Sequence, residues 1–386
     1  MFESTFADAG RRDWVDGDGD EGGDGGGSDG ADATTRIATV GCGNYARSVS
    51  IPAMARGDYA RPTVVVSGDA DKRSALADDF GVTALDYDEY EAGAATDEYD
   101  AVYVATPNRL HLPHVETAAG HGKHVICEKP LEATVERAER LVAACEDAGV
   151  RLMTAYRMQI DPVVRRLREF VAAGGIGDLQ RAVGDFTFPV LAGDAGPEQW
   201  RLDGRLAGGG ALYDVGVYPL NTARFVAGDD PTAVSATVRS PDDAFHEVDQ
   251  HVDFRVEFGA GDGGTGGGDG GTGSGNADGW VGNFSASFSG HPNTSLELLG
   301  TEGRIAVRSA FQPGADREVT VETTEGTMEL AGLGADETVE EFDYFAHAVA
   351  TGGDIEPDGA DGLVDMRTLA AAQASARAGE RIELER

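Results

Sequence analysis

The residues of this chain best suited to move a proton are a lysine and a tyrosine. The chain has three lysines, Lys72, Lys123 and Lys129, and arginine supplies the rest of its 31 basic side chains. A lysine ammonium is compact and its pKa moves with its surroundings, whereas a guanidinium stays charged. Lys129, in the segment Glu128-Lys129-Pro130, is therefore the first catalytic candidate.

Asp214, Tyr218 and Asn221 would share one face of a helix over residues 208–221, because they stand at i, i+4 and i+7. Oxidising an alcohol requires a base for the O–H proton while hydride leaves the carbon. A free phenol has a pKa of about 10, and a neighbouring ammonium favours its ionised form. A tyrosine beside Lys129 could therefore act as that base. Taken singly, Tyr218 could also be a buried structural tyrosine and Asp214 a surface charge.

A dinucleotide-binding turn is predicted near the start of the chain. A strand over residues 37–40 runs into a G-x-G-x-x-A motif and then a helical stretch. Gly41 permits the tight turn, Gly43 lets the backbone approach a pyrophosphate, and Ala46 packs the helix on the strand. The N–H groups at the start of that helix favour an anion, so even an acidic chain can bind the phosphates.

The end of the second predicted strand, residues 63–67, bears on the type of cofactor. Ser67 ends this strand, and Lys72 and Arg73 follow one helical step later. A hydroxyl and two cations suit the 2′-phosphate of NADP. Asp69 is the contrary observation, because an acidic residue in this region holds the ribose of NAD. We predict NADP, with NAD as the alternative.

Further site candidates follow the later strands. A turn after the strand at 101–105 and the Glu128 segment both reach the carboxyl edge of the sheet, where ligands of such folds bind. The predicted cofactor-binding residues are Gly41, Gly43, Asn44, Tyr45, Ser67, Lys72, Arg73, Thr106, Pro107, Asn108, His111, Glu128 and Lys129. His111 and His114 flank a predicted helix start and are favoured as structural residues over metal ligands. No side chains show metal-ligand spacing, so no metal is predicted.

Substrate-binding candidates lie around the same edge. Trp200 and Arg201 could form an aromatic platform and a hydroxyl clamp, or be a core tryptophan beside a surface arginine. Tyr156 and Arg157, just past the fifth strand, have the same two interpretations. The predicted substrate-binding residues are Lys129, Tyr156, Arg157, Trp200, Arg201, Asp214 and Tyr218.

The order of elements predicts two domains. Residues 36–155 alternate strands and helices, which indicates an α/β Rossmann domain with a doubly wound parallel sheet. Residues 156–386 carry longer alternating segments, which indicate an α+β domain with a large, mostly antiparallel sheet. Residues 1–35 are predicted to be an arm and a flexible Gly/Asp linker, and 259–279 a flexible Gly-rich loop. Phe2, Phe6 and Trp14 could dock the arm on the body.

Composition limits the possible partners. The chain has 68 acidic residues against 31 basic ones, a formal charge of −37. Such a charge disfavours nucleic acid and anionic membrane surfaces, and the acid excess with few lysines is typical of salt adaptation rather than of an ordinary acidic enzyme. Three cysteines without metal spacing favour a reduced cytoplasm. Arg11-Arg12 is followed by an acidic rather than an apolar segment, so an export signal is not predicted.

The ordered set of motifs at 41–46, 106–108, 128–130 and 214–221 resembles the glucose–fructose oxidoreductase/inositol dehydrogenase (Gfo/Idh/MocA) family. Many relatives carry histidine where this chain has Tyr218. Tyrosine there is similar to the branch that holds glucose–fructose oxidoreductase, dimeric dihydrodiol dehydrogenase and sugar 1-dehydrogenases. The resemblance implies that Lys129, Asp214 and Tyr218 line the reaction centre.

On that basis, the expected reaction is NADP-dependent oxidation of an aldopyranose, with D-xylose as the first candidate, at C1 to its lactone. Tyr218 would be the base, Lys129 its tuner and proton relay, and Asp214 the residue that orients the sugar or the lysine. A desolvated Lys129 acting as the base itself is the alternative. Glucose–fructose-type oxidoreduction, trans-dihydrodiol oxidation, NAD-dependent glycoside cleavage and nucleotide sensing stay open. A homo-oligomer formed through the second sheet is also expected.

Overall fold

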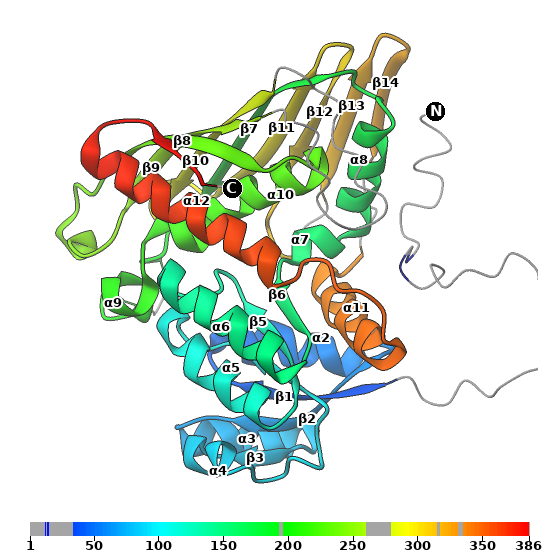
Figure 1. The fold of residues 1–386 in the computed structure, drawn as a ribbon, viewed down its shortest axis with the longest axis vertical. Helices are drawn as coiled ribbons and strands as arrows, with labels where there is room; N and C mark the ends of the chain where they lie inside the picture. The colour runs from blue at the N-terminus through cyan, green and yellow to red at the C-terminus, as the bar shows by residue number, and fades with distance from the viewer. Residues whose placement is uncertain are drawn as a thin grey trace, which may run out of the picture.

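The computed structural model describes residues 12, 14, 34–192, 196–259, 279–314, 317–330 and 335–385. Two sheets dominate these residues, one in each half of the molecule (Figure 1). Phe2, Phe6, the linker at 17–30 and nearly all of the predicted loop at 259–279 lie outside the described residues.

The N-terminal sheet has six parallel strands in the described part of the chain, in the order β3-β2-β1-β4-β5-β6. Its short strand β3 was not predicted from the sequence, because three residues carry too little pattern. The strands are β1 (Thr35–Val40), β2 (Ala60–Val66), β3 (Thr83–Leu85), β4 (Ala101–Val104), β5 (His124–Glu128) and β6 (Leu152–Ala155).

Both faces of this sheet are buried, as its nearly continuous apolar strands require. Val102 and Val104 of β4 pack in the core cluster on one face, whereas Ala101 and Tyr103 pack on the other. The helices of this half are α2 (Ile51–Arg56), α3 (Ala70–Phe80), α4 (Tyr87–Glu91), α5 (His111–Gly120) and α6 (Val135–Ala148), with short turns η1 (Ala46–Ser50) and η2 (Asn108–Leu110). The predicted doubly wound fold is confirmed.

The second sheet has nine strands among the described residues, in the order β14-β13-β12-β11-β7-β10-β9-β8-β15. All neighbours are antiparallel except β10 and β7, which confirms the mostly antiparallel prediction. The strands are β7 (Leu179–Thr187), β8 (Pro231–Arg239), β9 (His251–Phe258), β10 (Trp280–Ser287), β11 (Asn293–Gly300), β12 (Gly303–Arg308), β13 (Glu318–Thr323), β14 (Gly326–Leu330) and β15 (Ile382–Glu383). Sequence patterns missed β14 and β15.

Helices of the C-terminal half connect the two sheets. α10 packs on β7, β10 and β11, and α12 packs on β8 and on β6 and α6 of the first domain. Figure 1 shows α12 running along the sheet toward the N-terminal domain. These elements are α7 (Arg157–Ile160), α8 (Pro162–Ala172), α9 (Gly204–Ala207), α10 (Val217–Ala227), α11 (Glu337–Thr351) and α12 (Gly359–Ala378), with turns η3 (Trp200–Leu202), η4 (Leu212–Gly216) and η5 (Asp243–Phe245).

α11 is distant in sequence from the first domain but packs on it. Phe342 and Phe345 share a buried cluster with Ile37 of β1 and Val65 of β2, and Figure 1 shows α11 next to α2. The predicted boundary at 155/156 remains a prediction, and a segment far beyond it completes the covering of the first sheet.

Arg12 and Trp14 contact the body of the protein where α2 and α11 meet. Arg12 forms ion pairs with Asp58, Glu340 and Asp343, each with a nitrogen–oxygen distance of 2.8 Å. Trp14 packs near Tyr344, with ring centroids 5.8 Å apart. Burial raises the pKa of the Glu340 carboxyl, and Arg12 opposes that rise.

We expect Arg12→Ala to lower the free energy of unfolding by about 1 to 3 kcal/mol, because it removes charge-assisted hydrogen bonds to buried acceptors. Asp343 has a fully buried side chain, so it would lose its cation without gaining water. Arg140→Ala is the matched control, since Arg140 forms an exposed pair with Glu116. Urea unfolding at one salt concentration compares the variants, and equal losses would contradict the structural role of Arg12.

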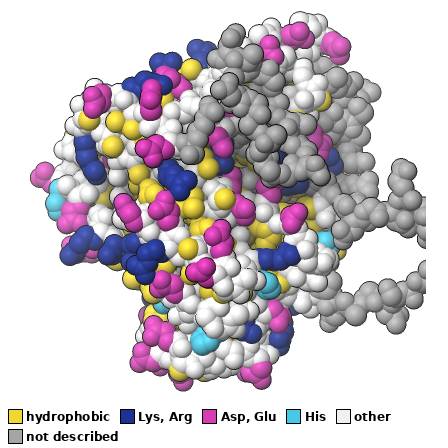
Figure 2. Space-filling model, viewed as in Figure 1, with side chains coloured by type: hydrophobic (Ala, Val, Ile, Leu, Met, Phe, Trp, Pro, Cys, Tyr) yellow, Lys and Arg dark blue, Asp and Glu magenta, His cyan; other side chains and the backbone are white. Residues whose placement is uncertain are grey.

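The described surface mixes acidic and basic side chains. Figure 2 shows Asp and Glu spread over the visible face with Lys and Arg among them. No helix among the described residues is long and apolar enough to cross a membrane.

Candidate functional site

The glycine-rich turn after β1 has the shape of a phosphate cradle. Gly41 has a φ of 98°, and a Cβ there would lie 2.8 Å from the backbone of Ala105. A Cβ at Gly43 would meet nothing within 4 Å, so open space borders this backbone. A tight turn at the first glycine and free approach at the second are what a dinucleotide pyrophosphate needs. The turn therefore fits the cofactor predicted from the sequence.

Residues around the turn complete this part of the site. Asn44 is exposed and Tyr45 half-buried at the start of the helical segment. Thr106 is buried, and its hydroxyl has no hydrogen-bond partner among the described residues. Asn108 instead donates its amide to the carbonyl of Ala207, at 2.9 Å. Asn44, Tyr45 and Thr106 are thus the polar groups available beside the cradle, whereas Asn108 joins the two domains.

The end of β2 brings the predicted 2′-phosphate residues together. Lys72 lies 3.0 Å from Asp69 in an exposed ion pair, and Asp69 also accepts the Lys72 backbone N–H as the N-cap of α3. Arg73 donates to the carbonyl of Ser67 at 3.0 Å. Asp69 therefore has a structural role as the N-cap of α3, Arg73 contacts Ser67, and Lys72 is paired with Asp69 in the same segment.

His111 lies behind the site rather than on its wall. It is fully buried, and its ring nitrogens contact the carbonyls of Leu131 and Thr106 at 3.0 and 2.9 Å. It therefore links the loops that follow β4 and β5, so any effect on the cofactor would pass through them.

His114 predicts a pH dependence of stability. Burial, with repulsion from His111, lowers the pKa of His114 to about 4, and its ring stacks on Tyr87. Between that value and the unfolded pKa of about 6.5, the unfolded chain binds a proton that the folded chain does not. Stability contributed by this group is present above about pH 6.5 and lost as the pH falls toward 4, by roughly 2 to 3 kcal/mol.

The check is urea unfolding of the wild type and His114→Gln across that pH window. We expect the loss of stability toward acid to be smaller in the variant, because glutamine does not titrate. A constant difference between the two proteins at every pH would show that His114 does not cause the effect.

Lys129 is held by Asp214. Its Nζ donates to the Asp214 carbonyl at 2.6 Å and to the carboxylate at 3.2 Å, and Arg201 donates to the other carboxylate oxygen at 2.9 Å. Burial tends to raise the pKa of Asp214, but Arg201 and Lys129 outweigh it and lower the pKa to about 2. Burial tends to lower the pKa of Lys129, yet attraction to Tyr218 and Asp214 raises it overall. The site therefore favours a lysine ammonium beside an aspartate anion.

Tyr218 lies next to two cations. Lys129 Nζ is 4.8 Å and the guanidinium carbon of Arg157 4.9 Å from its ring centroid. Phe186 and Phe311 pack against the same ring, with centroids 5.2 and 6.0 Å away. A phenol fixed by aromatic neighbours and flanked by positive charge suits proton acceptance.

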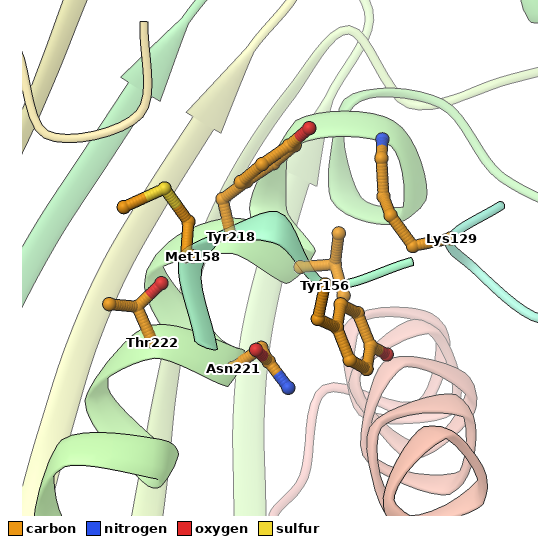
Figure 3. Close-up of a pocket in the computed structure, with 7 residues that line it drawn as sticks. Lys129, Tyr156, Met158, Tyr218, Asn221 and Thr222 are labelled. Atoms are coloured by element: carbon orange, nitrogen blue, oxygen red, sulfur yellow. The ribbon is translucent and has the colours of Figure 1, made fainter. Parts of the chain in front are cut away.

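A small pocket borders these groups. Figure 3 shows the Tyr218 hydroxyl and Lys129 ammonium at one end, with Asn221 and Thr222 toward the other. The pocket is lined by Lys129, Tyr156, Met158, Val217, Tyr218, Asn221 and Thr222.

Other predicted substrate residues differ in their placement. Tyr156 is on the pocket wall, with a buried hydroxyl close to the carboxylate of Asp365. Trp200 is half-buried, and the guanidinium of Arg201 lies 4.6 Å from its ring centroid. Arg157 is 3% exposed and enclosed by protein groups. Asn221, on the pocket floor, donates to Asp365 of α12 at 2.7 Å.

Two carboxylates near the site escaped sequence reasoning. Glu337 bonds Arg157 at 2.6 Å, and Glu341 is buried nearby on the same helix, α11. Burial raises the pKa of Glu341, with repulsion from Glu128 adding to it and Arg157 opposing it. Helix α11 follows the strands of the second sheet in the sequence, and it carries no motif that would indicate contact with the first domain. Sequence patterns therefore could not place these two carboxylates near the site. Among the described residues, no cluster of side chains could hold a metal ion.

The chain matches both sequence profiles of one family. Residues 35–156 match "Oxidoreductase family, NAD-binding Rossmann fold", and residues 164–306 match "GFO/IDH/MocA C-terminal domain". The chain therefore belongs to the Gfo/Idh/MocA oxidoreductase family. It is an NAD(P)-dependent sugar oxidoreductase.

Individual relatives are similar over nearly the whole chain. A D-xylose 1-dehydrogenase [NADP(+)] of Haloarcula marismortui is 40% identical over 365 residues, 93% of this chain and 92% of that protein. A D-xylose 1-dehydrogenase (NADP(+)) 2 of Haloferax volcanii is 32% identical, over 90% of this chain and 98% of that protein. The crystal structure of aldose–aldose oxidoreductase from Caulobacter crescentus, complexed with glycerol, superposes with a TM-score of 0.81 at 29% identity, covering 91% of this chain and all of that one.

Proposed function

We propose that this enzyme oxidises an aldopyranose, D-xylose, at C1 to the lactone with NADP. The observation that carries the proposal is the joint position of Lys129, Asp214 and Tyr218 beside one pocket. The similarity to D-xylose 1-dehydrogenases of Haloarcula marismortui and Haloferax volcanii supports the choice of sugar and cofactor.

In this proposal Tyr218 takes the proton of the C1 hydroxyl. Bound NADP supplies the acceptor for the hydride that leaves C1. Lys129 favours the phenolate through its charge, and Asp214 holds the ammonium next to the ring by two hydrogen bonds. The raised pKa of Lys129 keeps it protonated, which argues against a neutral lysine as the base. Lys129 can still relay the proton, because an ammonium can release one proton and regain another.

The cofactor would be held at two neighbouring points of the first sheet's carboxyl edge, after β1 and after β2. The cradle at Gly41 and Gly43 would take the pyrophosphate, and the cations at Lys72 and Arg73 would take the 2′-phosphate. Asp69 is already engaged by Lys72, which weakens the argument for NAD.

The assay is NADPH formation, followed by its absorbance, with NADP or NAD and a panel of aldoses in concentrated KCl. We expect reduction of NADP with D-xylose in preference to hexoses.

Glycoside cleavage without net reduction would favour the hydrolytic alternative. Turnover of aldose–ketose pairs without free NADPH would favour glucose–fructose-type chemistry, and oxidation of trans-dihydrodiols but not aldoses would favour a dihydrodiol dehydrogenase. Tight nucleotide binding without turnover of any substrate would favour a sensor.

We further propose salt adaptation, a cytoplasmic location and a homo-oligomer formed through the open face of the second sheet. Val183 of β7 and Arg255 of β9 are exposed and are both register partners of Asn283 in β10, so they share one face of the sheet. The residue after Val183, Gly184, instead faces Pro219 of α10. A pair of such faces would be self-complementary about a twofold axis. Sedimentation in concentrated KCl tests the homo-oligomer, because it measures the mass of the particle in solution.

A further inference from the structure

Arg157 is a buried cation directly beside the proposed base. Its side chain is 3% exposed. Among the described residues, Arg157 is not one of those that line the pocket. Its Nη1 donates to Glu337 at 2.6 Å and contacts the sulfur of Met158 at 3.6 Å, while Nη2 donates to the carbonyl of Phe311. Protein groups therefore bind both terminal nitrogens of the guanidinium, its Nε has no hydrogen-bond partner among the described residues, and the side chain is almost completely shielded from solvent.

The same guanidinium is as close to Tyr218 as the proposed catalytic lysine is. The distances to the ring centroid are 4.9 Å for the Arg157 carbon and 4.8 Å for Lys129 Nζ. The two cations come from different elements, because Arg157 begins α7 and Lys129 follows β5. Cations near an aromatic face are attracted to it, and the attraction increases when the ring carries a negative charge.

We infer that Arg157 is a positioning residue for Tyr218: it fixes the ring and favours the phenolate through its charge, without touching the sugar. This inference rests on the proposed function, in which Tyr218 is the base. A guanidinium suits this task because it stays charged and cannot compete for the proton. Arg157 would thus supply fixed charge, whereas Lys129 supplies charge and a transferable proton.

Arg157 belongs to a buried network of two arginines and two carboxylates, so its loss would leave a net negative charge near Tyr218. Its carboxylate partner, Glu337, is shared with Arg317 at 3.3 Å, and Arg317 is also paired with Asp161. A unit charge about 5 Å from a partly buried anion changes an ionisation equilibrium by roughly ten- to a hundredfold. Loss of Arg157 should therefore disfavour the phenolate even with Lys129 in place.

Other charged and titratable groups surround Tyr218 and its helix. Those nearest the ring, or linked to it through one contact, come from the cradle helix, the end of β5, α7, η3, η4 and α11: they are Tyr45, Lys129, Arg157, Arg201, Asp214, Glu337 and Glu341. On the α12 side, Arg224 of α10 pairs with Asp361 and Asp365. The single-residue comparison below holds all except Arg157 constant.

Arg317 provides a matched control. It is 9% exposed, bonds the carbonyl of Ala310 and shares Glu337 and the Met158 sulfur with Arg157. It belongs to the same buried network, but the ring contacts of Tyr218 involve Arg157 and not Arg317 among the described residues. Substituting either arginine disturbs the network, but only the substitution of Arg157 removes a positive charge that lies next to the Tyr218 ring.

The experiment measures kcat, KM for D-xylose and the pH profile of kcat/KM for Arg157→Gln, Arg157→Lys and Arg317→Gln. We expect Arg157→Gln to lower kcat about ten- to a hundredfold and to move the acid limb to higher pH. Arg157→Lys should recover part of both, because it keeps the charge. Arg317→Gln should lower thermal stability and leave the acid limb in place.

Three outcomes would overturn the inference. One is the same pH profile for Arg157→Gln and Arg317→Gln, and another is a higher KM for the sugar with unchanged kcat. The third applies if Arg157→Gln does not fold and Arg157→Lys is compared with the wild type instead: a kcat lowered at least about a hundredfold although the charge is kept would show that the charge is not what Tyr218 requires.

A double-mutant cycle separates this inference from the proposed function. If Arg157 acts through Tyr218, then Arg157→Gln lowers the residual kcat of Tyr218→Phe much less than it lowers that of the wild type. Near-wild-type activity of Tyr218→Phe would instead remove the proposed base itself. Loss of activity in Tyr218→Phe with additive effects in the cycle would refute only the role of Arg157.

Discussion

Tyr218→Phe is expected to lower kcat by about 10²- to 10⁴-fold, the range that a positioned general base contributes. The substitution removes the hydroxyl and keeps the ring, so packing against Phe186 and Phe311 should persist. KM for the sugar should change little, because the hydroxyl acts mainly in the transition state. The acid limb of the kcat/KM profile should also disappear or shift.

Tyr213→Phe is the control for losing a hydroxyl nearby. Tyr213 lies in η4, one turn before Tyr218, and is buried. Tyr213→Phe should leave kcat within about twofold, because the loss of a buried hydroxyl that does not react mainly lowers the free energy of unfolding. Near-wild-type kcat in Tyr218→Phe, or equal losses in both variants, would mean that the base is another group. Steady-state kinetics with NADP at saturating sugar decides between these results.

Sequence patterns predicted the elements that carry local signals. The G-x-G-x-x-A turn placed the cradle at Gly41 and Gly43, because glycine there answers a backbone requirement that can be read directly. The long strands of the second sheet were found because alternating burial follows alternating residue type. The strands β3, β14 and β15 were missed, since short edge strands depend on pairing more than on pattern.

The surroundings of the candidate base could not be read from the sequence in the same way. Glu337 stands 180 residues after Arg157, and only packing of α11 on the first domain brings them together. Asp214 lies in the wide helical turn η4, which comes just before Tyr218. The spacing of an ideal α-helix therefore describes the relative positions of Asp214 and Tyr218 only approximately. Lys123, which had no assigned role, donates to the carbonyls of Thr96 and Tyr99.

Lys129→Arg is expected to lower kcat by at least about 10²-fold, although it keeps the positive charge. Lys129 Nζ is 2.6 Å from the Asp214 carbonyl, and its side chain is 11% exposed. A planar guanidinium is larger, cannot release its proton and would displace the ammonium from this position. Lys129→Met should be at least as severe, because it removes the charge as well.

Lys72→Arg is the matched substitution at the predicted 2′-phosphate site. Lys72 is exposed and paired with Asp69, so there is room for a guanidinium, which binds phosphate well. We expect Lys72→Arg to keep KM for NADP within about threefold, and Lys72→Ala to raise it roughly tenfold with KM for NAD unchanged. An unchanged KM for NADP in Lys72→Ala would place the 2′-phosphate elsewhere.

The two arginine substitutions together distinguish charge from proton transfer. Arginine supplies most other cations in this chain, so the fold generally accommodates guanidinium groups where charge is all that is needed. If Lys129→Arg kept near-wild-type kcat, charge beside Tyr218 would suffice and the proton relay would be wrong. If Lys129→Arg fails while Lys72→Arg succeeds, the ammonium at Lys129 is required for its size and its mobile proton, and the one at Lys72 for its charge alone.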